Sequence, residues 1–376
     1  MRFQLSAETE LVRSVIREFA EREVGPGSFE RDKHSRFDRR LFAMMGELGL
    51  TGSLVPEAYG GTGAGALAWA AALEEVAGAC ASTAASLAVH AVYAAGAIVR
   101  FGSERLKEET LPQLAEGKLL GGFCPPAPAG SGPLFGRLSN GNRRLGGSIP
   151  IALNGADADI CIVFAQPDGD SRRLTGFALD MRDCERIPIK TALSTELKLG
   201  LRGLTTTGLT LDGMEAAQER RLGRAGQGTS VSQSLFGIAN LSAAAQSVGV
   251  AEAALRAAKG YAKERRQFGK PIARRQGISF KLADMAVRTE AARLLVYQAA
   301  WRMDSSLPSA KEAAIARVAA SQAAVYAASE AVQIFGGYGY MAEYRIERLL
   351  RDAQCLASPL GAGGMDTNPL RTIITE

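Results

Sequence analysis

The chain has 376 residues, which is too long for one small hydrophobic core and predicts two or three cooperating domains. It carries 44 lysine and arginine residues against 39 aspartate and glutamate residues, for a formal net charge of +5. Because the basic pairs are scattered along the chain, this balance indicates an ordinary solvated surface and argues against a nucleic-acid-binding protein.

Cysteine and histidine are both scarce in this sequence. The five cysteines include no Cys-x-x-Cys pair, which argues against a disulfide framework and against a structural zinc site. The two histidines, His34 and His90, are too few for a histidine-based metal centre and nearly exclude a Ser-His-Asp triad. We therefore expect no metal and a reducing compartment, and we assign the chain to the cytoplasm.

Residues 1–118 are predicted to form an N-terminal helical domain. Leu11, Val15 and Phe19 recur at the spacing of an amphipathic helix. Residues 77–99 contain no aspartate, glutamate, lysine or arginine, and they are mostly alanine, glycine, serine and threonine. Such small residues suit close helix packing, so we expect a buried helix here and no membrane span.

Residues 119–230 are predicted to form a middle antiparallel β domain, because turn residues separate short alternating or β-branched runs. The clearest runs are residues 160–164, 174–179 and 204–211. Helical periodicity returns over residues 231–376, where a C-terminal four-helix bundle is expected. The fold class is therefore predicted to be α+β, with a small β domain between two helical domains.

Two glycine-marked motifs stand out in the C-terminal third. Residues 265–272 read Arg-Arg-Gln-Phe-Gly-Lys-Pro-Ile, and residues 333–340 read Gln-Ile-Phe-Gly-Gly-Tyr-Gly-Tyr. Further landmarks are Pro-Glu-Ala-Tyr-Gly-Gly at 56–61, Lys-Leu-Gly-Leu-Arg-Gly at 198–203 and Arg-Asp-Ala at 351–353. In this order and spacing they resemble the acyl-CoA dehydrogenase family of FAD enzymes, over essentially the whole chain. The resemblance implies the same three-part architecture.

The resemblance also implies that FAD is held by two subunits at once, with the C-terminal bundle reaching toward the flavin of a partner. The arginine of the first motif would meet the pyrophosphate through a charge-assisted hydrogen bond. The glycines of the second motif would let backbone N–H groups approach the adenosine end closely. The cofactor-binding residues implied in this way are Arg265, Gln267, Phe268, Gln333, Gly336 and Gly337.

The half of the flavin site that the family supplies from its own β domain is altered in this chain. Pro126 replaces a threonine that bonds the flavin ring, and proline offers neither a hydroxyl nor an N–H group. Ile151 stands where a tryptophan stacks on the ring, and Leu153 stands where a second threonine bonds it. Only Ser131 and Asn154 remain as polar matches, and Ser131 joins the implied cofactor-binding residues.

The catalytic glutamate of the family is also replaced. Leu360 occupies its position after the Arg-Asp-Ala motif, and Ala239 occupies the alternative position on the first bundle helix. Neither side chain can act as a base toward the acyl Cα proton. If residues 359–364 are an insertion, Asp366 takes the place of the glutamate; otherwise the catalytic residue stays unknown.

The chain retains the cofactor motifs of the C-terminal bundle, whereas the flavin-ring contacts and the catalytic glutamate are replaced. This difference leads to two hypotheses for the function. In the first, the chain is a non-catalytic subunit of a heteromeric acyl thioester dehydrogenase and completes the FAD site of a related subunit. In the second, it is a self-sufficient acyl-CoA or acyl-carrier-protein dehydrogenase with Asp366 as the base. Only one half of the site is lost, and this asymmetry favours the first hypothesis. Whether the chain is itself an enzyme stays open.

The expected partners follow from the same resemblance. They are an acyl thioester substrate, a like or related dehydrogenase subunit in a homo- or hetero-oligomer, and an electron-transfer flavoprotein if the chain is active.

Overall fold

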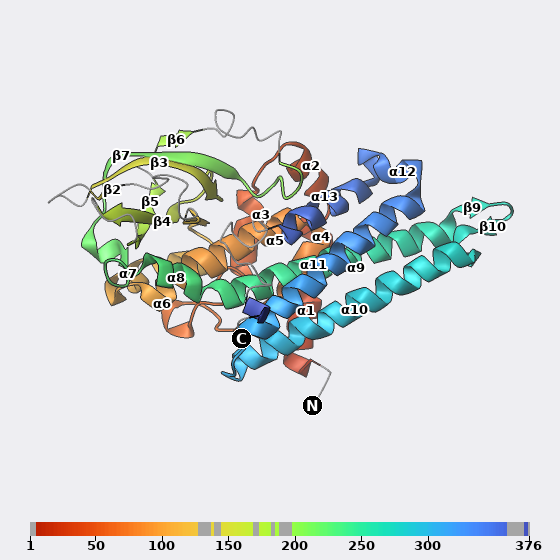
Figure 1. Cartoon of the computed structure of the whole chain (residues 1–376), viewed down its shortest axis with the longest axis horizontal. Helices are drawn as coiled ribbons and strands as arrows, with labels where there is room; N and C mark the ends of the chain where they lie inside the picture. The colour runs from red at the N-terminus through yellow and green to blue at the C-terminus, as the bar shows by residue number, and fades with distance from the viewer. Residues whose placement is uncertain are drawn as a thin grey trace.

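The structure is a computed structural model that describes residues 5–126, 137–138, 144–167, 173–181, 185–187, 198–358 and 372–374. Figure 1 shows an elongated molecule with a β-sheet at one end and long helices that extend to the opposite end. Helices precede the sheet in the chain, and helices follow it. This arrangement confirms the predicted α+β fold class.

The first part of the chain consists of helices around an alanine-rich centre. Ser6 caps α1 (Ala7–Phe19) by accepting a hydrogen bond from the Thr9 backbone N–H, and α1 passes directly into the π-helix η1 (Ala20–Val24). The remaining elements are α2 (Ser28–Lys33), α3 (Arg39–Glu47), η2 (Glu57–Tyr59), α4 (Gly65–Ala79), α5 (Ala81–Ala88), η3 (Val89–Ala95), α6 (Gly96–Phe101) and α7 (Glu104–Ala115).

The uncharged stretch at residues 77–99 is largely buried, as its small residues predict. It comprises the end of α4, all of α5 and η3, and most of α6, with Cys80 in an extended conformation between the first two helices. By length and composition, residues 81–101 and 228–264 could each cross a membrane, yet most of each lies inside the folded chain. Such burial is typical of core helices.

The middle part is a sheet with strand order β6-β7-β3-β1-β4-β5-β8, in which β2 pairs with both β3 and β4. The strands are β1 (Gly121–Phe123), β2 (Arg137–Leu138), β3 (Arg144–Leu153), β4 (Ile160–Pro167), β5 (Thr175–Asp180), β6 (Glu185–Ile187), β7 (Thr206–Glu215) and β8 (Arg221–Leu222). The 3₁₀-helix η7 (Gln218–Arg220) precedes β8.

The prediction of an antiparallel sheet is correct for most strand pairs and wrong for two of them. Both β1 and β2 pair antiparallel with β3 and parallel with β4, so the sheet is mixed. The reason is geometric, because β3 and β4 run in opposite directions. Any strand placed between them must be parallel to one of the two.

The C-terminal part confirms the predicted helical bundle. Its long helices are α9 (Phe236–Glu264), α10 (Gln276–Asp304), α11 (Ala310–Phe335) and α13 (Ile346–Ala357). Its short elements are α8 (Gly228–Ser234), β9 (Arg266–Gln267), β10 (Lys270–Pro271), η8 (Ile272–Arg274), α12 (Gly337–Tyr340) and η9 (Ala342–Tyr344). Rows of buried alanines on α9 and α11 let these helices pack closely.

Two buried polar side chains attach the sheet to the helices. The Nδ1 atom of His90 accepts a hydrogen bond from the Gly121 backbone N–H at 2.9 Å, and its Nε2 lies 3.1 Å from the Leu114 carbonyl oxygen. This pairing assigns the ring proton to Nε2. The Asn154 amide donates to the carbonyl oxygens of Ser86 and Gly121, each at 3.0 Å. Both side chains therefore hold the sheet at the start of β1.

Acid should weaken this attachment through His90. Burial lowers the pKa of His90 to about 4, whereas the ring titrates at about 6.5 in an unfolded chain. The neutral ring therefore contributes fully above about pH 6.5, and the contribution is lost as the pH falls toward 4. Between about pH 7 and pH 4 we expect the wild type to lose about 3 kcal/mol more stability than a His90→Gln variant, measured by urea unfolding. An equal loss in both proteins would contradict this assignment.

Candidate functional site

The residues implied for cofactor binding fall into two regions at opposite ends of the chain (Figure 1). The β9–β10 hairpin, the end of α11 and α12 lie at the tip of the bundle, and residues 265–268 and 333–337 lie on them or directly beside them. The sheet lies at the other end and carries Pro126, Ile151 and Leu153 at its strands or beside them. One chain therefore cannot bring its own two regions onto a single flavin.

The hairpin presents an aromatic ring to solvent. Phe268 and Gly269 form the turn between β9 and β10 with φ angles of 50° and 77°, as two-residue hairpin turns require. The Phe268 side chain is 89% exposed. The guanidinium of Arg275 lies 4.9 Å from the ring centroid and donates a hydrogen bond to the Gln267 carbonyl oxygen at 3.1 Å. This exposed ring is therefore held in place by its own chain.

The second motif lies beside the hairpin, where α11 ends. Gly336 has a φ of 61°, which lets the chain leave α11 and begin α12. Gly337 has no positive φ, and a Cβ added there would meet no atom within 4 Å. The fold itself therefore does not require glycine at 337, whereas close approach of a ligand or another subunit would. The Arg265 guanidinium lies 5.9 Å from the Tyr338 ring centroid, which brings the two motifs together.

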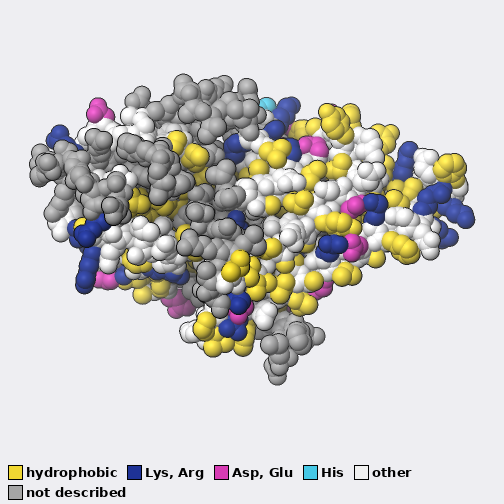
Figure 2. Space-filling view, viewed as in Figure 1, with side chains coloured by type: hydrophobic (Ala, Val, Ile, Leu, Met, Phe, Trp, Pro, Cys, Tyr) yellow, Lys and Arg dark blue, Asp and Glu magenta, His cyan; other side chains and the backbone are white. Residues whose placement is uncertain are grey.

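A row of exposed apolar side chains runs along α10. Its members, seven residues apart, are Phe280, Val287, Leu294 and Trp301. Because seven residues make nearly two helical turns, all four lie on one side of the helix. Figure 2 shows hydrophobic side chains spread over the helical half of the visible face. The sequence analysis missed this row, although its seven-residue spacing is visible in the sequence. A continuous exposed apolar row of this kind is typical of a contact surface.

The positions that would serve a flavin ring and a base surround a closed cavity. Leu153, Ala239 and Tyr93 line a space of about 10 Å³, the size of about one water molecule. The other lining residues are Ala85, Ala88, Val89, Leu201, Leu204, Ser242 and Gln246. The Tyr93 ring stacks on Phe123 with centroids 4.8 Å apart and fills the space beside the strand. The described residues therefore leave room for about one water molecule beside Leu153 and Ala239.

Acid–base groups are missing from the lining of this cavity. None of the described residues that line it carries a carboxylate. Burial raises the pKa of Tyr93 far above its ordinary value, so the phenol stays protonated. Among the described residues that line the cavity, none therefore offers a base for proton abstraction.

Three buried side-chain oxygens have no hydrogen-bond partner among the residues that the structure describes, one on a lining residue of the cavity and two on residues next to lining residues in the chain. They are Ser86 Oγ, Asn154 Oδ1 and Gln246 Oε1. Each such buried oxygen costs about 1–3 kcal/mol unless a water or a ligand satisfies it. The region thus keeps the capacity to bind a polar group by hydrogen bonds.

Three residues singled out by the sequence lie outside the described residues. They are Ser131, Leu360 and Asp366. The described residue nearest to Leu360 in the chain is Ser358, whose carbonyl oxygen accepts a hydrogen bond from Arg317 at 3.1 Å. Their assigned roles stay predictions from the sequence.

Comparisons with known proteins agree on one family. Residues 6–118 match the model "Acyl-CoA dehydrogenase, N-terminal domain", and residues 226–372 match "Acyl-CoA dehydrogenase, C-terminal domain". An acyl-CoA dehydrogenase of Bacillus subtilis (strain 168) is 42% identical over 357 residues, which cover 93% of this chain and 93% of that protein.

Two solved structures share this fold over nearly their full length. Butyryl-CoA dehydrogenase from Megasphaera elsdenii has a TM-score of 0.90 and 35% identity, covering 99% of this chain and 98% of that one. A chain from the structure described as "Electron transferring flavoprotein of Acidaminococcus fermentans: Towards a mechanism of flavin-based electron bifurcation" has a TM-score of 0.90 and 34% identity. That match covers 100% of this chain and 98% of the other.

The row along α10 should be essential for assembly. In the assembled protein we expect the double substitution Val287→Glu/Leu294→Glu to release this chain as a monomer, because two carboxylates in an apolar interface would lose water without gaining partners. Light scattering after size-exclusion chromatography measures the mass. Leu48→Glu, at another exposed apolar position at the end of α3, is the control and should keep the wild-type mass. A double variant that also keeps this mass would show that the row is not an interface.

Proposed function

This chain belongs to the acyl-CoA dehydrogenase family of FAD-dependent dehydrogenases, and we propose that it is one subunit of a heteromeric member. In that assembly its C-terminal bundle completes an FAD site whose ring side belongs to a related subunit. The related subunit also supplies the base and the acyl thioester pocket. The proposal rests on one contrast, in which the cofactor motifs are exposed at one end of the chain while the ring side is closed at the other.

The exposed end is suited to a flavin that another subunit holds. Within the described residues the Arg265 side chain forms no ion pair. Its guanidinium faces the Tyr338 ring, with the ring centroid 5.9 Å away. Its N–H groups therefore stay free to meet a pyrophosphate. The open space at Gly337 and the exposed ring of Phe268 lie at the same tip.

The closed end explains why this chain would depend on a partner for chemistry. Bound FAD supplies the hydride acceptor for α,β-dehydrogenation of an acyl thioester. A positioned base contributes typically about 10²–10⁴-fold to such a proton abstraction. Because the lining of the cavity holds no described carboxylate, and because Pro126 and Leu153 offer no side-chain hydrogen bonds, both tasks pass to the partner.

We assign the electron acceptor and the compartment on separate grounds. An electron-transferring flavoprotein is the proposed acceptor, since the description of one structural neighbour names such a protein. The Sγ atoms of Cys124 and Cys161 are buried 3.4 Å apart and are not joined by a disulfide bond, which suits a reducing compartment such as the cytoplasm.

A second candidate function is a self-sufficient dehydrogenase with Asp366 as its base. It is favoured by the three buried oxygens without partners, which would gain hydrogen bonds if the cavity opened around a ligand. In this case the chain would bind FAD and an acyl thioester in its own site.

Flavin content separates the two functions. Purified alone, the chain should carry far less than one FAD per protomer, whereas its complex with a related dehydrogenase subunit should be saturated, as the visible spectrum measures. In the complex, Arg265→Gln should weaken FAD binding about ten- to a hundredfold, because a hydrogen bond to a charged group is worth about 1.5–3 kcal/mol. Arg105→Gln, at an exposed position on α7, is the control. Stoichiometric FAD with turnover in the chain alone would falsify the subunit proposal.

Substitution of Asp366 by alanine also distinguishes the two candidate functions. As a subunit without its own base, the chain should support unchanged turnover of the complex after Asp366→Ala. As a self-sufficient enzyme it should lose about 10²–10⁴-fold in turnover. Unchanged thermal unfolding of the variant confirms that the comparison concerns chemistry and not folding.

A further inference from the structure

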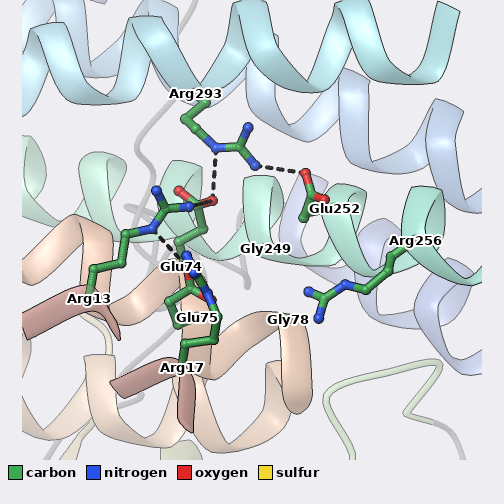
Figure 3. Close-up of a pocket in the computed structure, with 9 residues that line it drawn as sticks. All are labelled: Arg13, Arg17, Glu74, Glu75, Gly78, Gly249, Glu252, Arg256 and Arg293. Carbon is green, nitrogen blue, oxygen red and sulfur yellow. Dashed lines mark hydrogen bonds and ion pairs between the residues drawn. The ribbon is translucent and has the colours of Figure 1, made fainter. Parts of the chain in front are cut away.

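A charged cleft lies where the N-terminal helices meet the bundle. Two adjoining hollows of about 240 and 330 Å³ share Arg17, Glu75, Gly78 and Arg256, so they form one space. The walls come from α1 and η1, the end of α4, the middle of α9 and the start of α13. Figure 3 shows the smaller hollow, with Arg13 and Arg17 grouped around the glutamates and Arg256 separated from them.

One wall of the cleft is a network of ion pairs. The buried Glu74 carboxylate accepts a hydrogen bond from Arg293 Nε at 2.9 Å. The Glu75 carboxylate accepts hydrogen bonds from Arg13 Nε at 2.7 Å and from Arg17 Nη2 at 2.8 Å. These three arginines already have carboxylate partners, so they shape the wall without offering much uncompensated charge.

Arg348, in contrast, is buried with an unsatisfied donor. Its residue surface is only 7% exposed, and its Nε has no hydrogen-bond partner among the described residues. Burial raises the pKa of the nearby Asp352 carboxyl to about 6, and the charge of Arg348 opposes this rise. A buried guanidinium with an unused N–H group is unfavourable unless a water or a ligand satisfies that group.

Two further arginines face the wider hollow with weak partners. Arg345 has a φ of 61°, which is sterically unfavourable for a residue with a side chain, and its guanidinium lies 5.6 Å from the Phe29 ring centroid. Arg256 lies 3.4 Å from Glu21, but both side chains are more than half exposed, so the pair is weak. Both guanidinium groups thus remain available to an anion in the hollow.

The charge balance and the donor geometry identify the kind of ligand. The wider hollow has four arginines against two glutamates, an excess of two positive charges. Planar guanidinium groups match phosphate oxygens through paired hydrogen bonds. We propose that this cleft binds the phosphate group of a small phosphorylated ligand, at a site separate from the flavin-binding motifs. A ligand held there joins η1, α9 and α13 and stabilises the folded chain in proportion to its saturation.

Titration of the full-length chain with inorganic phosphate tests the site, with heat measured by calorimetry in a low-salt buffer and chloride as the blank. The wild type should show saturable binding at one site per chain. Arg256→Gln/Arg345→Gly should weaken binding at least about tenfold, because each substitution removes a charged donor. Glycine at 345 keeps the left-handed backbone, so this variant should retain the wild-type unfolding temperature.

Two control variants locate the anion. Arg105→Gln/Lys118→Gln removes two exposed charges on and near α7 and should bind phosphate like the wild type. Arg265→Gln, in the flavin-binding motif, should also bind like the wild type. Phosphate binding lost in Arg265→Gln but kept in Arg256→Gln/Arg345→Gly would place the anion at the flavin site and overturn the proposal. An absence of saturable binding in the wild type would overturn it as well.

Discussion

Close approach of α9 to its neighbours is the constraint on which the rest of this structure depends. A Cβ added at Gly249 would lie 2.2 Å from the Glu74 carbonyl oxygen on α4, so this helix crossing requires glycine. From the crossing, α9 extends back to the closed cavity at Ala239 and forward to the hairpin that follows Arg265. The cavity, the arginine-lined cleft and the exposed cofactor motifs therefore lie along one helix of 29 residues.

That arrangement lets the two halves of the flavin-binding pattern change independently. Substitutions at the sheet end, such as Pro126 and Leu153, share no contact with the hairpin at the far end of the bundle, and distant sites act additively on stability. A chain can thus lose the ring side of its own site and keep the surface that serves another subunit. In the proposed assembly, the partner needs only the hairpin and the end of α11 from this chain.

The helices and most strands could be predicted from local sequence patterns, whereas the cavity and the cleft could not. Periodicity in the sequence is enough for α1 and α11, and the resemblance located Arg265 and Gln333 at one tip. The parallel pairing of β1 with β4 depends on strand order, which no local pattern encodes. The Tyr93 ring that fills the cavity belongs to a helix whose small residues predicted only burial. The cleft joins side chains from α1, α4, α9, α10 and α13, including Arg13 and Glu75, 62 positions apart.

The row on α10 restricts the shape of whatever covers it. An α-helix has about 3.6 residues per turn, so positions repeated every seven residues drift about 20° around the helix with each repeat. A straight neighbouring helix would leave such a row after a few turns, and contact over its whole length needs a left-handed crossing of about 20°. Any helix with the same seven-residue period satisfies that geometry, and a second α10 is one such helix. The row therefore selects a neighbour by its period, and in the proposed assembly an identical subunit and a related subunit with the same period would compete for this surface.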